Sequence, residues 1–114
     1  MAYAMRKYAQ VESGNLALGQ AGSAFLDTAG TTFTPTDHGA GKAVIAITAL
    51  TDVKFSTLTA ESSNTYINTA GAGSGGGGDT FSASDTIPKG VTIYGRWTSV
   101  SVSTNGEQCI CYVG

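Results

Sequence analysis

Charged residues are scarce in this sequence: Asp, Glu, Lys and Arg make up 12% of its 114 residues, about half of the share that is usual in globular domains. The six basic and eight acidic residues are spread along the chain, and the net charge is only −2. Electrostatic binding to nucleic acid depends on a basic stripe or patch, which is missing here. We therefore expect no nucleic-acid partner.

Long apolar runs are also absent. No uninterrupted apolar run is longer than five residues, as at Ala43–Ile47, whereas a helix that crosses a bilayer needs about 20. Near the N-terminus, Arg6 and Lys7 precede the mixed segment Tyr8–Glu12, which is unlike the apolar part of a signal peptide. We therefore expect no membrane contact, and assembly in a cytoplasm.

Histidine occurs once, so a common acid–base group is nearly missing. His38 lies beside Asp37 in the loop-like segment 35–41, and the chain has no Gly-x-Ser-x-Gly motif. Nothing singles out a pair among the eight acidic residues for glycoside chemistry. We expect His38 to be a surface loop residue and the protein not to be an enzyme. A small hydrolase that uses His38 is an alternative.

The only two cysteines, Cys109 and Cys111, are spaced Cys-x-Cys. On a strand, both side chains point to one face with Cα atoms about 6.5–7 Å apart, which is at the limit for a mutual disulfide. We expect two small buried thiols on one strand face. Intermolecular pairing and metal binding are the alternatives. With His38 the chain offers at most three soft ligands, so we expect no metal site and no cofactor.

Glycine, serine and threonine are abundant, at 43 of 114 residues (16 Gly, 11 Ser and 16 Thr). This composition favours short strands and turns over helices. Residues 42–50 predict a central strand because apolar side chains occur on both of its faces, and residues 53–57 predict a half-buried strand. Residues 71–79 contain six glycines and predict a flexible loop. A phosphate-binding loop would end in Lys followed by Ser or Thr, whereas this one ends in Asp79.

The C-terminal residues 87–114 predict a β-hairpin that runs to the end of the sequence. Asn105-Gly106 is a strong hairpin signal, because both residues tolerate the positive φ of a type I′ turn. Along the preceding strand the apolar positions change from odd to even numbers between Trp97 and Val100. Such a change of phase requires a β-bulge or a strand that changes sheets, and Gly95 is the predicted kink.

Arg96 and Trp97 are neighbours on that strand. We expect Trp97 to fill the core and Arg96 to lie on the opposite face. A cation–π or ligand-binding platform formed by the pair is the alternative.

These patterns together predict an all-β fold, an antiparallel sandwich or jelly-roll-like single domain with a C-terminal hairpin. We place the β-sandwich domain at residues 25–114 and an extended N-terminal arm at residues 1–24, where patterning is weak. We predict that the arm binds a partner protein, because exposed tyrosines are common in interfaces. The predicted contact residues are Tyr3, Arg6, Lys7 and Tyr8.

Several turn and core patterns resemble those of small virion structural proteins of tailed bacteriophages. The segments that carry this resemblance are Phe33–Pro35, Gly41–Ile47, Asp52–Phe55, Ile87–Trp97, Gly106 and Tyr112–Gly114. The resemblance implies a capsid decoration or cement protein, which would bind the major capsid protein on the outer surface of the virion between capsomers. It also implies a homo-oligomer, with a homotrimer favoured.

A tail, fibre or adhesin module that binds a host-surface glycan or protein is the alternative function. Its receptor site would lie in residues 59–86, in a groove lined by Tyr66 and Phe81. A small domain of this kind needs no catalytic constellation in either role, since many weak contacts in an array add up through multivalency.

Overall fold

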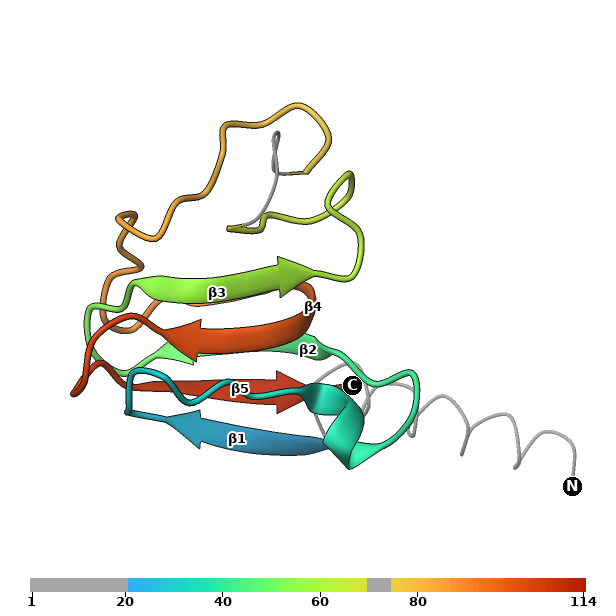
Figure 1. Cartoon of the computed structure of the whole chain (residues 1–114), viewed down its shortest axis with the longest axis horizontal. Coiled ribbons are helices and arrows are strands. Elements are labelled where there is room, and N and C mark those ends of the chain that lie inside the picture. The colour runs from blue at the N-terminus through green and yellow to red at the C-terminus, as the bar shows by residue number, and fades with distance from the viewer. Residues whose placement is uncertain (1–20, 70–74) are drawn as a thin grey trace, which may run out of the picture.

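The protein is an all-β single domain, as the sequence predicts. The computed structural model describes residues 21–69 and 75–114. Its five strands form one antiparallel sheet in the order β1-β5-β2-β4-β3 (Figure 1). The elements are β1 (Gly22–Leu26), the 3₁₀ helix η1 (Pro35–His38), β2 (Val44–Ala49), β3 (Phe55–Ala60), β4 (Thr92–Val102) and β5 (Cys109–Val113). Within residues 21–69 and 75–114, no helical segment has the length and hydropathy of a bilayer-spanning helix.

Strand β2 is the centre of the sheet, which confirms the prediction for residues 42–50. It pairs antiparallel with β4 on one side and with β5 on the other. Val44 and Ile47 are fully buried, and even Ala46 on the opposite face is only 8% exposed. Apolar side chains on both faces therefore suit the strand at the middle of the five-stranded sheet.

Strand β4 changes register where the apolar phase changes, as predicted. Against β2, Trp97 pairs with Val44 and Tyr94 pairs with Ala46, so two residues of β4, Gly95 and Arg96, lie opposite one residue of β2. Against β3, Thr59 pairs with Ser99 and the next residue, Ala60, pairs with Trp97, so Thr98 is the extra residue of a β-bulge. These irregularities let β4 present apolar side chains to the core along its whole length.

The predicted C-terminal hairpin is wrong, because β2 lies between β4 and β5. The chain does turn there, with the Glu107 N–H donating to Thr104 O at 3.2 Å, but the turn is not the predicted type I′. Gly106 has a φ of 94°, whereas Asn105 does not have a positive φ. The turn is anchored on the segment after β1, where Gly106 N–H donates to Asp27 O at 3.0 Å. Residues 103–108 thus carry the chain across two strand spacings, about 10 Å, which leaves room for the apolar β2.

The sheet begins at Gly22, three residues before the predicted start of the folded domain at Phe25. Ala21 already donates its N–H to Val113 O at 3.2 Å. Residues 22–24, which the sequence assigns to the N-terminal arm, therefore belong to β1. The rest of the predicted arm, up to residue 20, lies outside the described residues.

One face of the sheet carries the hydrophobic core, and the long connection from β3 to β4 supplies part of the layer above it. The fully buried large side chains include Trp97, Phe55, Ile47 and Leu58. Four of the partly buried apolar side chains that pack against the core come from outside the strands: Phe33, Ile67, Phe81 and Ile87. Isolated bridges from Phe33 to Val100 and from Val53 to Ile87 hold this layer to the sheet. In Figure 1 the same connection extends beyond β3, at the end of the sheet opposite β1.

Candidate interaction surface

The face of the sheet opposite the core is uncharged over four strands. Strand pairing places its side chains in two rows that cross β1, β5, β2 and β4. The rows are Phe25–Ile110–Thr48–Thr92 and Ser23–Tyr112–Ala46–Tyr94. We call these eight residues the open face. None of them carries a charge.

The open face exists because each of its strands alternates in and out of the core. On β5, Cys109, Cys111 and Val113 are buried on the core side, so Ile110 and Tyr112 point the other way. On β1, Leu26 is buried, whereas its neighbour Phe25 is exposed. The sequence predicts burial of the cysteine side of β5, but Ile110 and Tyr112 are also apolar, so the pattern does not show that their side stays open to solvent.

Two large side chains of the open face are mostly exposed to solvent. The exposed fraction is 55% for Phe25, on the edge strand β1, and 76% for Tyr94, on β4. Between them, Ile110 and Tyr112 are half-buried. The hydroxyls of Thr48 and Thr92 hydrogen-bond to each other at 2.9 Å, which reduces their need for water. The result is an amphipathic surface of the kind that is enriched in protein–protein contacts.

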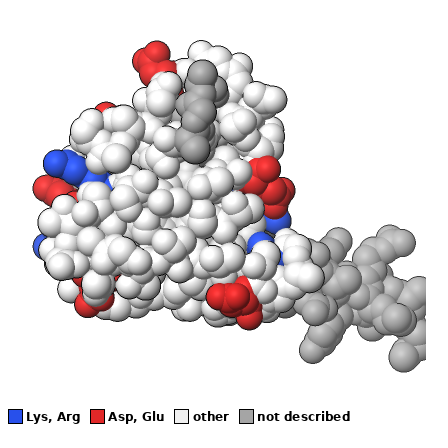
Figure 2. Space-filling model, viewed as in Figure 1, with Lys and Arg blue, Asp and Glu red and all other residues white. Residues whose placement is uncertain are grey.

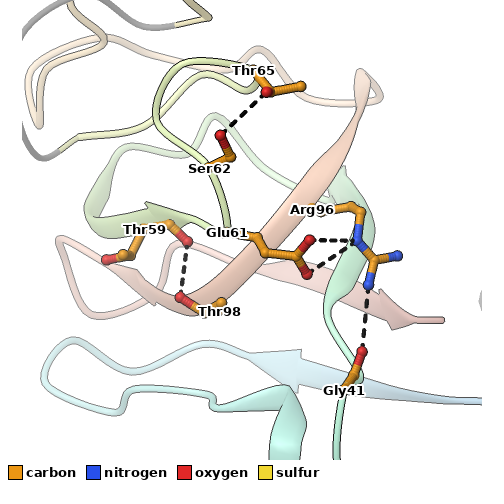
Figure 3. Close-up of polar contacts among 7 residues, drawn as sticks. All are labelled: Gly41, Thr59, Glu61, Ser62, Thr65, Arg96 and Thr98. Atoms are coloured by element: carbon orange, nitrogen blue, oxygen red, sulfur yellow. Dashed lines mark hydrogen bonds and ion pairs between the residues drawn. The ribbon is translucent and has the colours of Figure 1, made fainter.

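The charged groups nearest to the open face along β4 are already paired. Figure 3 shows Arg96, two residues beyond Tyr94, with its Nε 3.1 Å from Glu61 Oε2 and its Nη2 donating to Gly41 O at 3.4 Å. This ion pair is solvent-exposed and lies where β3 ends. In the view of Figure 2, charged side chains lie around the margin of the folded part, and its middle is uncharged.

Trp97 is a core residue, which confirms the first interpretation of the Arg96-Trp97 pair. Its side chain is fully buried, and its Nε1–H donates to Ile67 O at 2.8 Å. The indole ring lies against Gly95, where a Cβ would come within 2.8 Å of the ring. Gly95 therefore provides space for the ring as well as the predicted kink. Arg96 pairs with Glu61 and not with the indole.

His38 is exposed at the end of η1. Its ring makes an edge contact with Phe33, with ring centroids 5.5 Å apart and planes at 82°. The same ring lies over Gly22, where a side chain would overlap with it. No group of three or more His, Cys, Asp or Glu residues that could hold a metal ion is found in residues 21–69 and 75–114. Through its contacts with Phe33 and Gly22, His38 connects η1 to the start of β1.

Cys109 and Cys111 are buried free thiols on the core face of β5, as the sequence predicts. Their side chains are hydrogen-bonded to each other, and this bond together with burial raises the pKa of the Cys111 thiol above its ordinary value. Cys111 therefore stays protonated at neutral pH and is a poor nucleophile.

We expect the thiols of the folded protein to react with iodoacetamide at least about tenfold more slowly than those of the unfolded protein, because alkylation requires an exposed thiolate. The rates are measured by mass spectrometry with and without guanidinium, and peptide mapping assigns each site. Rapid alkylation of Cys111 in the folded protein would contradict this arrangement.

The residues predicted to bind a partner, Tyr3, Arg6, Lys7 and Tyr8, lie outside the described residues. So does residue 70 together with the first part of the Gly-rich segment, up to residue 74.

The described end of the Gly-rich segment is exposed, and Gly75 N–H donates to the carbonyl oxygens of Ser63 and Tyr66, both at 3.2 Å. Of the two aromatic residues predicted to line a receptor groove, Phe81 packs against the core and Tyr66 is half-buried. The open face, which sequence reasoning missed, is the candidate surface that the structure adds.

Comparisons with family models, with curated proteins and with solved structures each gave no match.

Proposed function

We propose that this protein is a non-enzymatic structural protein that binds subunits of an assembled protein shell through its open face. The shell that the sequence resemblance suggests is a phage capsid, with the major capsid protein as partner and the outer surface between capsomers as the binding place. The observation that carries the proposal is the open face itself: eight uncharged residues in two ordered rows, with Phe25 and Tyr94 mostly exposed.

The chemistry of the open face favours a protein partner. An aromatic, uncharged surface gains affinity mainly by excluding water from apolar side chains. An anionic ligand would find no free basic group along β4, because Arg96, the nearest one, is held by Glu61 and Gly41.

The size of the open face favours an array over a single binary complex. Four strands about 4.8 Å apart and about 17 Å long cover about 300 Å², whereas a stable interface buries about 800 Å² on each partner. A single contact of this size is weak. On a shell that offers many equivalent places, linked copies convert weak contacts into lasting attachment.

The test is binding to shells that were assembled without this protein. Purified protein is added, bound copies are counted after sedimentation, and the melting temperature of the shells is measured. We expect the wild type to bind and to raise the shell melting temperature. Tyr94→Lys should weaken binding at least about tenfold, because it removes an exposed aromatic contact and introduces a charge that must be desolvated.

Val91→Lys is the matched control. Val91 is also an exposed apolar residue, at 40%, but it precedes β4 and is not part of the open face. Equal binding by Tyr94→Lys and the wild type would refute the role of the open face. Binding to purified tail or fibre fractions or to host-surface glycans, but not to shells, would instead support the alternative function of attachment.

A further inference from the structure

The edge strand β1 lacks the features that usually prevent an edge from pairing. Within residues 21–69 and 75–114 it pairs only with β5, and its five residues run in continuous register from Gly22 to Leu26. Natural edge strands are commonly protected by charged residues, proline, bulges or a covering segment. The sequence of β1, Gly-Ser-Ala-Phe-Leu, has no charge and no proline, and its pairing shows no bulge.

The other edge of the sheet, β3, is covered. Leu58 N–H donates to Thr69 Oγ1 at 2.9 Å, and Thr69 N–H donates back to Leu58 O at 2.9 Å. Thr69 belongs to the long connection that extends past β3 in Figure 1. The two edges of the sheet therefore differ, and of the two β1 is the one suited to accept another strand.

We propose that β1 pairs antiparallel with β1 of a second copy of this chain. A ring of copies built by strand pairing requires two different free edges, whereas one free edge can pair only with itself around a twofold axis. Each half of the pair supplies the extended backbone that the other needs, so the donors and acceptors of both edges are satisfied.

The side chains of β1 suit this symmetry. Pairing centred on Ala24 places Phe25 opposite Ser23 of the second copy, so each large ring lies beside a small side chain on the open face. No charged residues meet within the strand, and Asp27 lies beyond its end. Like charges directly opposite each other, which would oppose self-pairing, are therefore absent.

The twofold axis of an antiparallel pair stands perpendicular to the sheet, so both open faces lie on the same side of a ten-stranded sheet. This would double the uncharged surface to about 600 Å², closer to the 800 Å² of a stable contact. This consequence for shell binding rests on the function proposed above, whereas the pairing of β1 does not. Because five residues per copy bury little area, we expect a dissociation constant of micromolar or weaker.

Sedimentation of the full-length protein over a range of concentrations tests the proposal. We expect a reversible equilibrium between one copy and two. Phe25→Lys should raise the dissociation constant at least about tenfold, because it places two like charges near the twofold axis. Two controls should leave the equilibrium unchanged: Val91→Lys, outside the open face, and Tyr94→Lys, which lies on it but three strands away from β1.

Any of the following three results would overturn the pairing of β1. A chain that stays monomeric at all concentrations excludes it. Equal sensitivity to Phe25→Lys and Tyr94→Lys indicates contact between whole open faces. An assembly of three copies, which the sequence resemblance favours, requires a different interface. The shell-binding proposal fails separately, if Tyr94→Lys binds shells as well as the wild type does. That result would not alter the self-association measured by sedimentation.

Hydrogen exchange gives a second measurement that needs no variant. We expect the backbone amides of β1 to become better protected as the protein concentration rises, while those of β3 do not change. Protection of β1 that is high and independent of concentration would mean that the same chain already covers this edge, and it would overturn the proposal.

Discussion

Replacing Trp97 with alanine is expected to lower the free energy of unfolding by about 3–5 kcal/mol. Trp97 is the largest fully buried side chain, and it lies where β4 passes from pairing with β2 to pairing with β3. Its removal leaves a cavity in the core and deprives Ile67 O of its 2.8 Å hydrogen bond. Domains of this size are stable by only about 5–15 kcal/mol, so much of the native stability would be lost.

Trp97→Phe separates the two contributions. Phenylalanine keeps an aromatic ring in the core but cannot donate to Ile67 O, so we expect a smaller loss of about 1–3 kcal/mol. The measurement is urea unfolding followed by circular dichroism, because the variants lack the single tryptophan as a fluorophore. Val91→Ala is the control at an exposed position and should change the free energy of unfolding by no more than about 0.5 kcal/mol. A loss below about 1 kcal/mol for Trp97→Ala would be incompatible with the buried position of the indole.

Most strands of the sheet could be predicted, but neither β1, most of which the sequence assigns to the N-terminal arm, nor the strand order could be. A strand is marked by local alternation or by a short apolar run, and both signals are clear at β2 and in the change of phase along β4. Strand order depends on pairings between residues far apart in the sequence. The turn at Asn105-Gly106 shows the difference, because it reverses the chain as predicted and yet joins strands that β2 separates.

The open face was missed for a related reason. Alternation along β1 and β5 shows that these strands have two faces, but both sets of side chains on β5 are apolar. Burial of the cysteine side is decided by the second layer, to which Phe81 and Ile87 contribute from the connection between β3 and β4. Nothing local to β5 shows that the side with Ile110 and Tyr112 stays open to solvent. By contrast, Cys109 and Cys111 could be predicted as buried free thiols, because strand geometry alone limits a Cys-x-Cys pair.

Replacing Glu107 with alanine should destabilise the protein by about 2 kcal/mol, although Glu107 forms no ion pair among the described residues. One carboxylate oxygen accepts Thr104 N–H at 2.8 Å and Ser103 Oγ–H at 3.0 Å. The other accepts Lys54 N–H at 3.0 Å, which ties the turn between β4 and β5 to the segment before β3. Hydrogen bonds to a charged acceptor are stronger than neutral ones. The contact with Lys54 spans 53 positions of sequence, so no local pattern could reveal it.

Glu61→Ala is the matched control for this prediction. Glu61 forms the ion pair with Arg96, but its side chain is 46% exposed, and such surface pairs contribute about 0–1 kcal/mol. We therefore expect Glu61→Ala to lower the free energy of unfolding less than Glu107→Ala, although only Glu61 forms an ion pair among the described residues. The measurement is urea unfolding of these two variants and of Glu107→Gln. Glutamine keeps one acceptor oxygen and should recover part of the loss. If Glu61→Ala were as destabilising as Glu107→Ala, stability would depend on the surface charges, and the carboxylate that joins the turn to Lys54 would have no special role.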